Sequence, residues 1–311
     1  MNRIANILVI VDPTADAQPA VAKAALLAEK FHARLELFAC ETKASREARL
    51  AAHMRTQPDE PFVVNLKAVL ESLATPLRAR GLDVSTETVR ADPLHVALLE
   101  RTQLTTADLV VKDTHHHTLA KRTILSNTDW HLIRGCPVPL LLAKPTFWAE
   151  SPRIVAAVDP GHANDKPSAL DLRILDHAAL FAQKLGGELH ALHAYIPMSV
   201  IITSATSPPM AGAITPEDLA RDREMELKQV SALVSDYAVT ADRIHLEAGG
   251  TAEVLSRFAT QLKADIMVMG AISRSGLKRA FVGSTAEDVL EHLPCDALIV
   301  KSPNFAELLP F

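Results

Sequence analysis

The sequence is short of several residue types, and each shortage excludes a class of protein. Among 311 residues there are 11 glycines, three cysteines and 4% aromatic residues, whereas 48% are apolar and 22% charged. This composition excludes collagen-like, coiled-coil and disordered chains. The three cysteines are widely spaced and lie in or beside apolar runs (Cys40, Cys136 and Cys295). A thiol in such a run acts as a small hydrophobic group, so the pattern favours a reducing compartment over a disulfide framework.

Other absences narrow the function. The 32 basic and 37 acidic residues give a net charge of −5, which does not favour nucleic-acid binding. No segment reaches the roughly 18 apolar residues of a membrane span, and residues 1–10 follow a strand pattern without a basic region or cleavage site. We therefore expect a cytoplasmic protein, neither secreted nor inserted in a membrane. The P-loop sequence and the Cys-x-x-Cys motif are both missing, which disfavours a P-loop motor and thiol redox chemistry of that type.

The chain repeats itself. Asn6–Pro13 reads NILVIVDP, and Arg153–Pro160 reads RIVAAVDP, 147 positions later. From Ala107 onward the offset is 157, and it holds without a gap to the end of each half. The difference of ten indicates an insertion in the middle of the second half, most simply the stretch from Thr203 to Thr215 with its Ser, Pro and Gly content.

The repeat predicts two domains, residues 1–145 and residues 152–303. The linker between them is Lys144–Ser151, where Pro145 and Pro152 interrupt any regular element. Short apolar runs alternate with segments of helical period in each half, a pattern typical of a parallel sheet covered by helices. The expected strands are 6–12, 34–40, 82–89, 107–112 and 138–143, and then 153–159, 188–195, 243–248, 265–269 and 296–301. The clearest helix begins at Thr215 and runs to about Ala238.

The predicted fold is therefore α/β, with two tandem doubly wound domains, each built on a five-stranded parallel sheet. Ligands of such domains bind beyond the carboxyl ends of the strands, where the strand order reverses. In the second half this edge collects groups suited to phosphate. Strand four runs into Gly270, and Gly283 opens the last helix. Glycine lets a ligand approach the backbone, and a helix N-terminus offers unpaired N–H groups.

Further polar residues complete the outline of a nucleotide pocket. Ser284 and Thr285 follow Gly283 and add hydroxyl donors, while Asp159 ends the first strand of the second half. The carboxylate of Asp159 is suited to accept hydrogen bonds from a sugar hydroxyl or a base amine. We expect the end of the second strand, His193-Ala194-Tyr195, to lie against the base. The alternative is that the two glycines form only a turn and a helix start, without a ligand.

This arrangement resembles the universal stress protein family. Its nucleotide-binding members carry Gly, two residues, Gly, nine residues and then Gly with Ser or Thr, together with an Asp at the end of strand one. Asp159, Gly270, Gly283 and Ser284 match this pattern, but Ser273 stands where the second glycine is expected. The serine either weakens binding or donates its hydroxyl to a phosphate. The resemblance implies a fold like that of adenine nucleotide alpha hydrolases, and ATP, with or without Mg, as the ligand.

The first half departs from that motif. Its counterparts are Asp113, His116, Ser126 and Asn127, with no glycine among them. Because Asp113 places a negative charge where a phosphate would approach, we expect no triphosphate there. The loop with His115-His116-His117 and the run Asp129-Trp130-His131-Leu132 resemble the tandem UspE subgroup of the family. The histidines leave two interpretations open: a solvated polar loop, or a zinc site made by His115 and His117 with a distant carboxylate.

The expected function is ligand binding rather than turnover. The resemblance implies a bacterial stress-response protein whose second domain binds an adenine nucleotide, and whose two domains pair within the chain through their last strands, with a homodimer also open. Ser284 has no neighbouring histidine or acid typical of a nucleophile elbow. A slow ATPase is one alternative. The other is an ATP-independent interaction protein that holds a lipid-like molecule, a sugar nucleotide or nothing.

Overall fold

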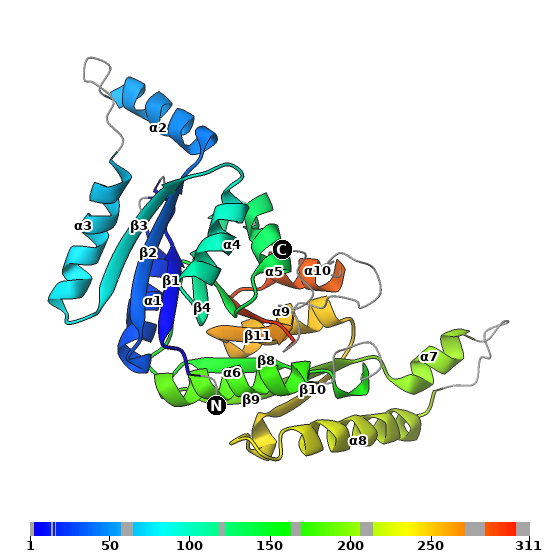
Figure 1. The fold of residues 1–311 in the computed structure, drawn as a ribbon. Helices are drawn as coiled ribbons and strands as arrows, with labels where there is room; N and C mark the ends of the chain where they lie inside the picture. Colours follow the sequence, from blue (N-terminus) through cyan, green and yellow to red (C-terminus); the bar gives the residue numbers. More distant parts are fainter. Residues whose placement is uncertain are drawn as a thin grey trace. The chain divides into compact units, whose positions relative to one another are not determined.

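A computed structural model describes residues 3–13, 15, 17–56, 65–117, 122–162, 169–205, 214–270 and 284–302 (Figure 1). The chain divides into two compact units. The first extends to Thr146 and the second begins at Phe147, with Lys121–Thr123 grouped with the second unit.

The first unit alternates strands and helices. Its elements are β1 (Asn6–Ile10), α1 (Pro19–Phe31), β2 (Arg34–Glu41), α2 (Lys43–Thr56), α3 (Leu66–Ala79), β3 (Val84–Arg90), α4 (Leu94–Leu104), β4 (Leu109–Asp113), β5 (His115–His117), α5 (Asn127–Gly135) and β7 (Leu140–Ala143). Strand β6 (Arg122–Ile124) lies between β5 and α5 in the chain, and its first two residues are grouped with the second unit. Five of the strands form a parallel sheet in the order β3-β2-β1-β4-β7, and β5 and β6 form a separate two-stranded sheet.

The second unit repeats this architecture. Its elements are β8 (Arg153–Ala157), η1 (Pro160–His162), α6 (Leu170–Leu185), β9 (Glu188–Tyr195), α7 (Met198–Ala205), α8 (Pro216–Leu233), η2 (Ala241–Arg243), β10 (Ile244–Ala248), α9 (Thr251–Leu262), β11 (Ile266–Gly270), α10 (Ser284–His292) and β12 (Asp296–Val300). Its sheet is also parallel, in the order β10-β9-β8-β11-β12. Each unit thus follows the order 3-2-1-4-5, and the strand order reverses between the first and fourth strands.

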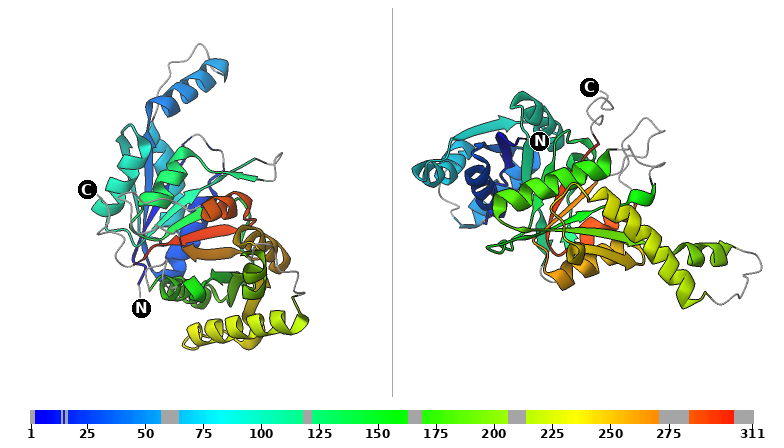
Figure 2. Two further views of the ribbon diagram at one scale, coloured as in Figure 1. Left: turned by 90° about the vertical axis from the view of Figure 1, so that its right-hand side faces the viewer. Right: turned by 90° about the horizontal axis from the view of Figure 1, so that it is seen from below.

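Burial on both faces explains why the central strands read as apolar runs. Every residue of β4, β7 and β12 is buried. In the second unit α6 packs on β8, β9 and β11, while α9 packs on β8 and β9 and contacts α10. These two groups of helices cover opposite faces of the sheet (Figure 2). The core therefore consists of two layers, one on each side of every sheet.

The repeated Ala-Asp pair has a structural role in both units. Asp108 accepts hydrogen bonds from the N–H groups of Ala5 and Asn6 at 2.8 and 3.0 Å. Its counterpart Asp265 accepts from the N–H groups of Ala149 and Arg153 at 2.9 and 2.8 Å. Each carboxylate thereby fixes the start of the first strand beside the fourth. Both units thus share this hydrogen-bonding arrangement, which lies at the amino ends of the strands, opposite the predicted ligand site.

Several predicted boundaries need correction. The first strand of each unit ends at Ile10 and Ala157 rather than at the aspartates, so Asp12 and Asp159 stand two residues beyond it. Helix α8 begins as predicted, because Thr215 forms a capping box with Asp218, but it ends at Leu233. The expected insertion from 203 to 215 begins inside α7, and residues 206–213 lie outside the described residues.

The segment between the units is anchored. Trp148 Nε1–H donates to Asp296 Oδ2 at 2.8 Å, and the Ala149 N–H donates to Asp265 Oδ1. Asp296 is 1% exposed. These bonds fasten the predicted linker to the second unit.

Candidate functional site

A cavity of about 250 Å³ lies at the carboxyl ends of β8, β9 and β11, where the strand order of the second unit reverses. Three of the predicted site residues line it together: Asp159, Ala194 and Gly270. The sequence argument anticipated this convergence, because parallel strands end at the same edge of their sheet. Whether these residues bind a ligand stays a prediction.

The walls of this cavity are mostly apolar. Apart from Asp159, the polar residue among those that line it is Thr251, the first residue of α9. The apolar lining residues are Ala157, Val158, Leu170, Ile174, Leu192, Ala194, Leu255, Met269, Ala286 and Val289. Such walls suit a flat heterocycle or another largely apolar body, with Asp159 placed to accept hydrogen bonds from it.

The end of β9 does not present its aromatic side chains to the cavity. His193 and Tyr195 are absent from the lining residues, and Ala194 alone of the predicted trio lines the cavity. Successive strand residues face opposite sides of a sheet, which explains the alternation. His193 Nδ1 instead bonds the main-chain oxygen of Val158 at 3.0 Å. This contact holds the peptide that precedes Asp159.

Gly270 is in close contact with a side chain. A Cβ atom at this position would lie 2.6 Å from Cδ2 of Leu170, the first residue of α6. The absence of a side chain at Gly270 therefore makes room for Leu170 as well as for any ligand. Sequence reasoning missed this partner because nothing in the pattern shows which helix residue meets the strand end.

Of the remaining residues predicted for the nucleotide site, the structure describes only two. Ser273 and Gly283 lie outside the described residues. Ser284 and Thr285 form the start of α10, and the next residue of that helix, Ala286, lines the cavity. The first turn of α10 therefore reaches the same cavity as Asp159 and Gly270.

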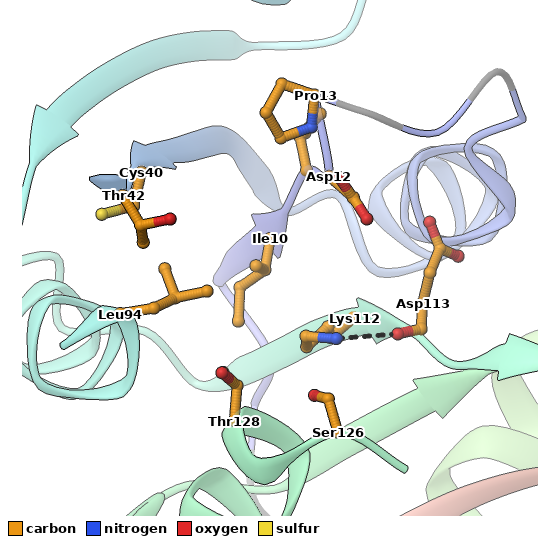
Figure 3. Close-up of a pocket in the computed structure, with 11 residues that line it drawn as sticks. Ile10, Asp12, Pro13, Cys40, Thr42, Leu94, Lys112, Asp113, Ser126 and Thr128 are labelled. Atoms are coloured by element: carbon orange, nitrogen blue, oxygen red, sulfur yellow. Dashed lines mark hydrogen bonds between the residues drawn. The ribbon is translucent and has the colours of Figure 1, made fainter. Parts of the chain in front are cut away.

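The first unit has a corresponding cavity of about 220 Å³ (Figure 3). It is lined by Ile10, Val11, Asp12, Pro13, Cys40, Thr42, Leu94, Lys112, Asp113, Ser126 and Thr128. Burial raises the pKa of the Cys40 thiol, whose sulfur lies 3.6 Å from the main-chain oxygen of Ala91. The two units thus carry cavities at the same place in the fold, with different polar groups.

An internal ion pair lies at the start of α5, which corresponds to the predicted phosphate position at the start of α10 in the second unit. Ser126 is the N-cap of α5, and its N–H and hydroxyl both donate to Asp129 Oδ2, at 2.7 and 2.8 Å. Asp129 is fully buried, and its Oδ1 lies 2.7 Å from Lys112 Nζ. The start of α5 is therefore capped by its own side chains, and Lys112 balances the charge.

The second unit has none of these three side chains. At the offset of 157, Met269 replaces Lys112, Gly283 replaces Ser126 and Ala286 replaces Asp129. Of these, Met269 and Ala286 line the cavity. The same position in the fold thus carries a complete internal cap in one unit and apolar or small residues in the other. The lysine was a signal in the sequence, since Lys112 and Asp113 place two charges at the end of a strand that is otherwise apolar.

Asp113, the counterpart of Gly270, caps a different helix. Its Oδ1 accepts the Ala20 N–H at the start of α1, at 2.6 Å. The pKa of this carboxyl is raised to about 6, because burial and, to a smaller extent, Asp12 outweigh the opposing effects of the Ala20 hydrogen bond, Lys112 and Lys23. The predicted acidic group is thus present in the cavity, where it would repel a phosphate.

The histidine-rich segment is placed by its backbone. His115 and His117 are the ends of strand β5, and their side chains lie outside the described residues. Within the described part of the chain, no three histidine, cysteine or acidic side chains come together as a metal site. Over the same residues, no helix has the length and apolar character needed to cross a bilayer.

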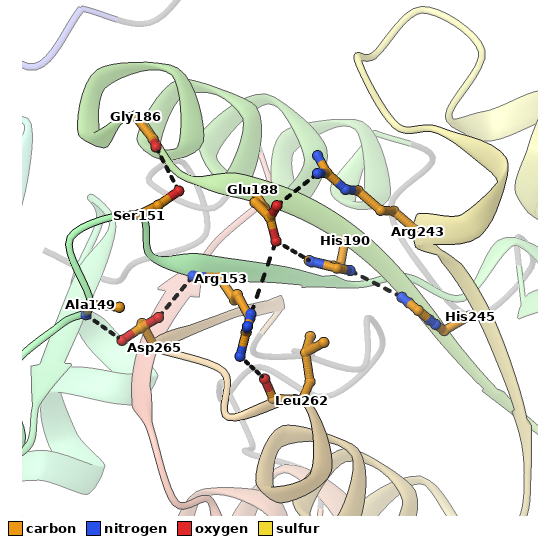
Figure 4. Close-up of polar contacts among 10 residues, drawn as sticks. All are labelled: Ala149, Ser151, Arg153, Gly186, Glu188, His190, Arg243, His245, Leu262 and Asp265. Atoms are coloured by element: carbon orange, nitrogen blue, oxygen red, sulfur yellow. Dashed lines mark hydrogen bonds and ion pairs between the residues drawn. The ribbon is translucent and has the colours of Figure 1, made fainter.

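A further polar cluster lies near the amino ends of β9 and β10 in the second unit (Figure 4). His190 Nδ1 is 3.1 Å from His245 Nε2, and His190 Nε2 is 3.6 Å from Glu188 Oε2. Glu188 also pairs with Arg243 at 2.8 Å. Burial lowers the pKa of both histidines, and for His245 the neighbouring His190 lowers it further. This cluster joins β9 to β10 and lies apart from the cavity.

The fold and the two cavities define a tandem pair of doubly wound α/β domains, a class that holds ligands where the strand order reverses. Comparison with known proteins agrees. The universal stress protein family matches residues 3–144 and again residues 151–301. The chain belongs to the universal stress protein family, as its sequence motifs predicted, and both the family assignment and the fold class are confirmed.

Several universal stress proteins match this chain over nearly its whole length and nearly their own. Universal stress protein E of Escherichia coli K12 is 27% identical over 303 residues, which cover 96% of this chain and 95% of the relative. The Universal stress protein E homolog of Haemophilus influenzae is 27% identical over 307 residues, covering 95% and 97%. A solved structure of a putative universal stress protein from Pseudomonas aeruginosa is 28% identical, with a TM-score of 0.76 over 98% of this chain and 96% of that one. The predicted tandem UspE type is therefore confirmed.

Proposed function

We propose that the second unit binds ATP or another adenine nucleotide, and that the protein acts in the bacterial cytoplasm as a ligand-dependent regulator or protective protein. The base and sugar would occupy the cavity at the ends of β8, β9 and β11, with Asp159 accepting hydrogen bonds from them. The phosphates would extend toward the segment from Gly270 to Thr285, with or without Mg.

The difference between the two units is the observation that carries this proposal. In the first unit, Ser126, Asp129 and Lys112 supply the start of α5 with an anion and its counterion. In the second unit the corresponding residues are Gly283, Ala286 and Met269. The start of α10 therefore lacks the counterpart of the Asp129–Lys112 pair, although Glu287 lies in its first turn. A helix start favours a bound anion, and phosphate is the usual one.

The first experiment is to identify what the purified protein carries. The full chain is purified without added ligand and denatured, and the released molecules are identified and counted by mass spectrometry. We expect about one adenine nucleotide per chain, or, if the protein is empty, binding of added Mg-ATP in a calorimetric titration. A lipid-like molecule or sugar nucleotide in its place would support the ATP-independent alternative, which the apolar cavity walls favour.

Matched variants locate the site. Asp159→Asn should weaken ATP binding by about tenfold, the effect of losing about 1.4 kcal/mol of hydrogen bonding. Asp12→Asn, the same change in the first unit, should leave ATP binding unchanged. Equal effects of the two substitutions would contradict the assignment to the second unit, and unaltered binding in Asp159→Asn would remove Asp159 from the site.

Turnover is tested separately by phosphate release. No residue among those that line the cavity is placed to orient an attacking water beyond Asp159 and Thr251, so binding is the activity we propose. Release that disappears in Gly283→Val, with the fold retained, would favour the slow ATPase. Release that persists in this variant would indicate a contaminating enzyme.

We also infer that the two domains pair within one chain through their last strands, β7 and β12. Each is the last strand of its own unit's five parallel strands. β7 is wholly apolar, and β12 is apolar after its first residue, Asp296. An unpaired apolar edge strand is prone to associate with another chain, so pairing inside the chain removes that hazard.

A further inference from the structure

The cavity of the first unit offers carboxylates to a ligand where the second offers a helix start. We propose that this cavity binds a small organic cation, an apolar molecule carrying one primary amine, with the ammonium group held between Asp113 and Asp12. The site is independent of nucleotide binding by the second unit and calls for the opposite charge.

One carboxylate oxygen of Asp113 lacks a hydrogen-bond donor. The residue is 7% exposed and lines the cavity. Its Oδ1 is used by the Ala20 N–H, while its Oδ2 is buried and accepts no hydrogen bond from any described residue. A buried carboxylate oxygen without a donor is costly, and a donor on a ligand would remove that cost.

Lys112 does not meet this demand. Its ammonium group pairs with Asp129 at 2.7 Å and donates to the main-chain oxygen of Asp113 at 3.0 Å, so its charge is already balanced. The other neighbouring cation, Lys23, donates to the main-chain oxygen of Lys144 at 2.8 Å.

The two acids are also arranged for a cation. The carboxylates of Asp113 and Asp12 are turned toward each other in Figure 3. Like charges in this arrangement repel, and Asp12 thereby adds a small contribution to the pKa of Asp113, which is raised mainly by burial. An ammonium group placed between them carries three N–H donors and a positive charge, so it would give Asp113 Oδ2 a donor and lie beside the negative charge of Asp12.

The rest of the cavity specifies the body of the ligand. Ile10, Val11 and Leu94 are apolar residues that line the same cavity, which suits a hydrocarbon chain or ring. A phosphate is excluded because the start of α5 is already capped by Ser126 and Asp129. A bare metal ion is a poor fit, because no three metal-binding side chains come together among the described residues.

Calorimetry of the full-length protein at neutral pH tests the proposal with hexylamine and phenethylamine as probes and phenethyl alcohol as the neutral match. We expect the better amine to bind once per chain, at least about tenfold more tightly than the alcohol. Asp113→Asn and Asp12→Asn should each reduce amine affinity by about tenfold without changing binding of the alcohol. Two variants are used so that a folding defect in one leaves the other to decide.

Asp159→Asn, the matched change in the second unit, should leave amine binding intact, and Mg-ATP should not compete with the amine. The proposal is overturned if neither amine binds at millimolar concentration, if the alcohol binds as well as the amine, or if the folded Asp113 and Asp12 variants keep full amine affinity. Because ATP binding is measured on the same variants, failure of either proposal is seen separately from the other.

Discussion

Gly270 stands at the end of β11, where a Cβ atom would come within 2.6 Å of Leu170 Cδ2. Its φ is not in the left-handed region, unlike that of Gly81, Gly186 and Gly249. The requirement for glycine at residue 270 therefore comes from contact rather than from backbone conformation. At the scale of single residues, the end of β11 and the first residue of α6 therefore constrain each other's side chains.

This contact makes a prediction for stability. Gly270→Ala should lower the free energy of unfolding by about 1 kcal/mol or more, because Leu170 must move in a packed region. In a Leu170→Ala background the same substitution should cost less than about 0.5 kcal/mol, because the space is then open. Urea unfolding of the four proteins measures the difference.

Gly161→Ala serves as the control for this cycle. An added Cβ atom there has no neighbour closer than 3.9 Å, so its effect should be the same in both backgrounds. If Gly270→Ala also had equal effects in both backgrounds, the contact with Leu170 would not be the reason for glycine.

At the scale of elements, β9 and β10 are joined by the contact between His190 and His245 as well as by their backbone hydrogen bonds. A 3.1 Å contact between two ring nitrogens requires one nitrogen to donate and the other to accept, so at least one of these nitrogens must be unprotonated. Protonation of both rings would break the contact and place two cations side by side.

Acid should therefore weaken the second unit through these histidines. In the unfolded chain they protonate near the ordinary value of 6.5, whereas burial lowers the pKa of both in the fold. Their contribution to stability is then complete above pH 6.5 and is lost as the pH falls below it, with about 1.4 kcal/mol for each pKa unit of difference. Unfolding measured across this range should show less pH dependence in His245→Gln than in the wild type.

The control is His292→Gln, which changes an exposed histidine of α10. It should leave the pH dependence as it is in the wild type. A His245→Gln protein whose stability falls with acid as steeply as the wild type would show that the strand-joining pair does not carry the effect.

At the scale of the whole molecule, the tandem repeat bears on the mass and size of the protein in solution. If the last strands pair internally as we propose, the protein in solution should be a monomer of 33.7 kDa. Its radius of gyration should be roughly 20 Å, the value expected of a compact particle of this length. Light scattering and small-angle X-ray scattering give the two quantities. A monomer with a radius well above about 25 Å would contradict pairing within the chain. A doubled mass would indicate the homodimer.

Much of this organisation could be predicted because it depends on patterns along the chain. The offset between the halves and the alternation of apolar runs with helical segments predicted the two doubly wound domains. The family came from the resemblance of Asp159, Gly270, Gly283 and Ser284 to its motif. The convergence of Asp159, Ala194 and Gly270 on one cavity followed from the topology of parallel sheets. Strand ends were predicted less well, because Asp12 and Asp159 look like the last strand residues but follow the strand by two positions.

Contacts between side chains distant in the sequence were not predictable in this way. The pairing of Lys112 with Asp129 depends on where β4 ends relative to the first turn of α5, and that of Gly270 with Leu170 depends on the approach of α6. We expected His193 to line the ligand cavity beside a bound base. Its ring contacts the main-chain oxygen of Val158 instead, because neighbouring residues of a strand face opposite sides of the sheet. Ser273 and Gly283 lie outside the described residues, so their roles stay predictions.

The capped start of α5 has a consequence for how such domains change over time. Lys112 and Asp129 are both buried, and removal of either one alone strands the other as an unmatched charge, at a cost of about 3–5 kcal/mol. Conversion to the apolar arrangement of the second unit would therefore need at least two coordinated substitutions. Single mutations at this pair are disfavoured, so the capped helix start is protected against stepwise loss.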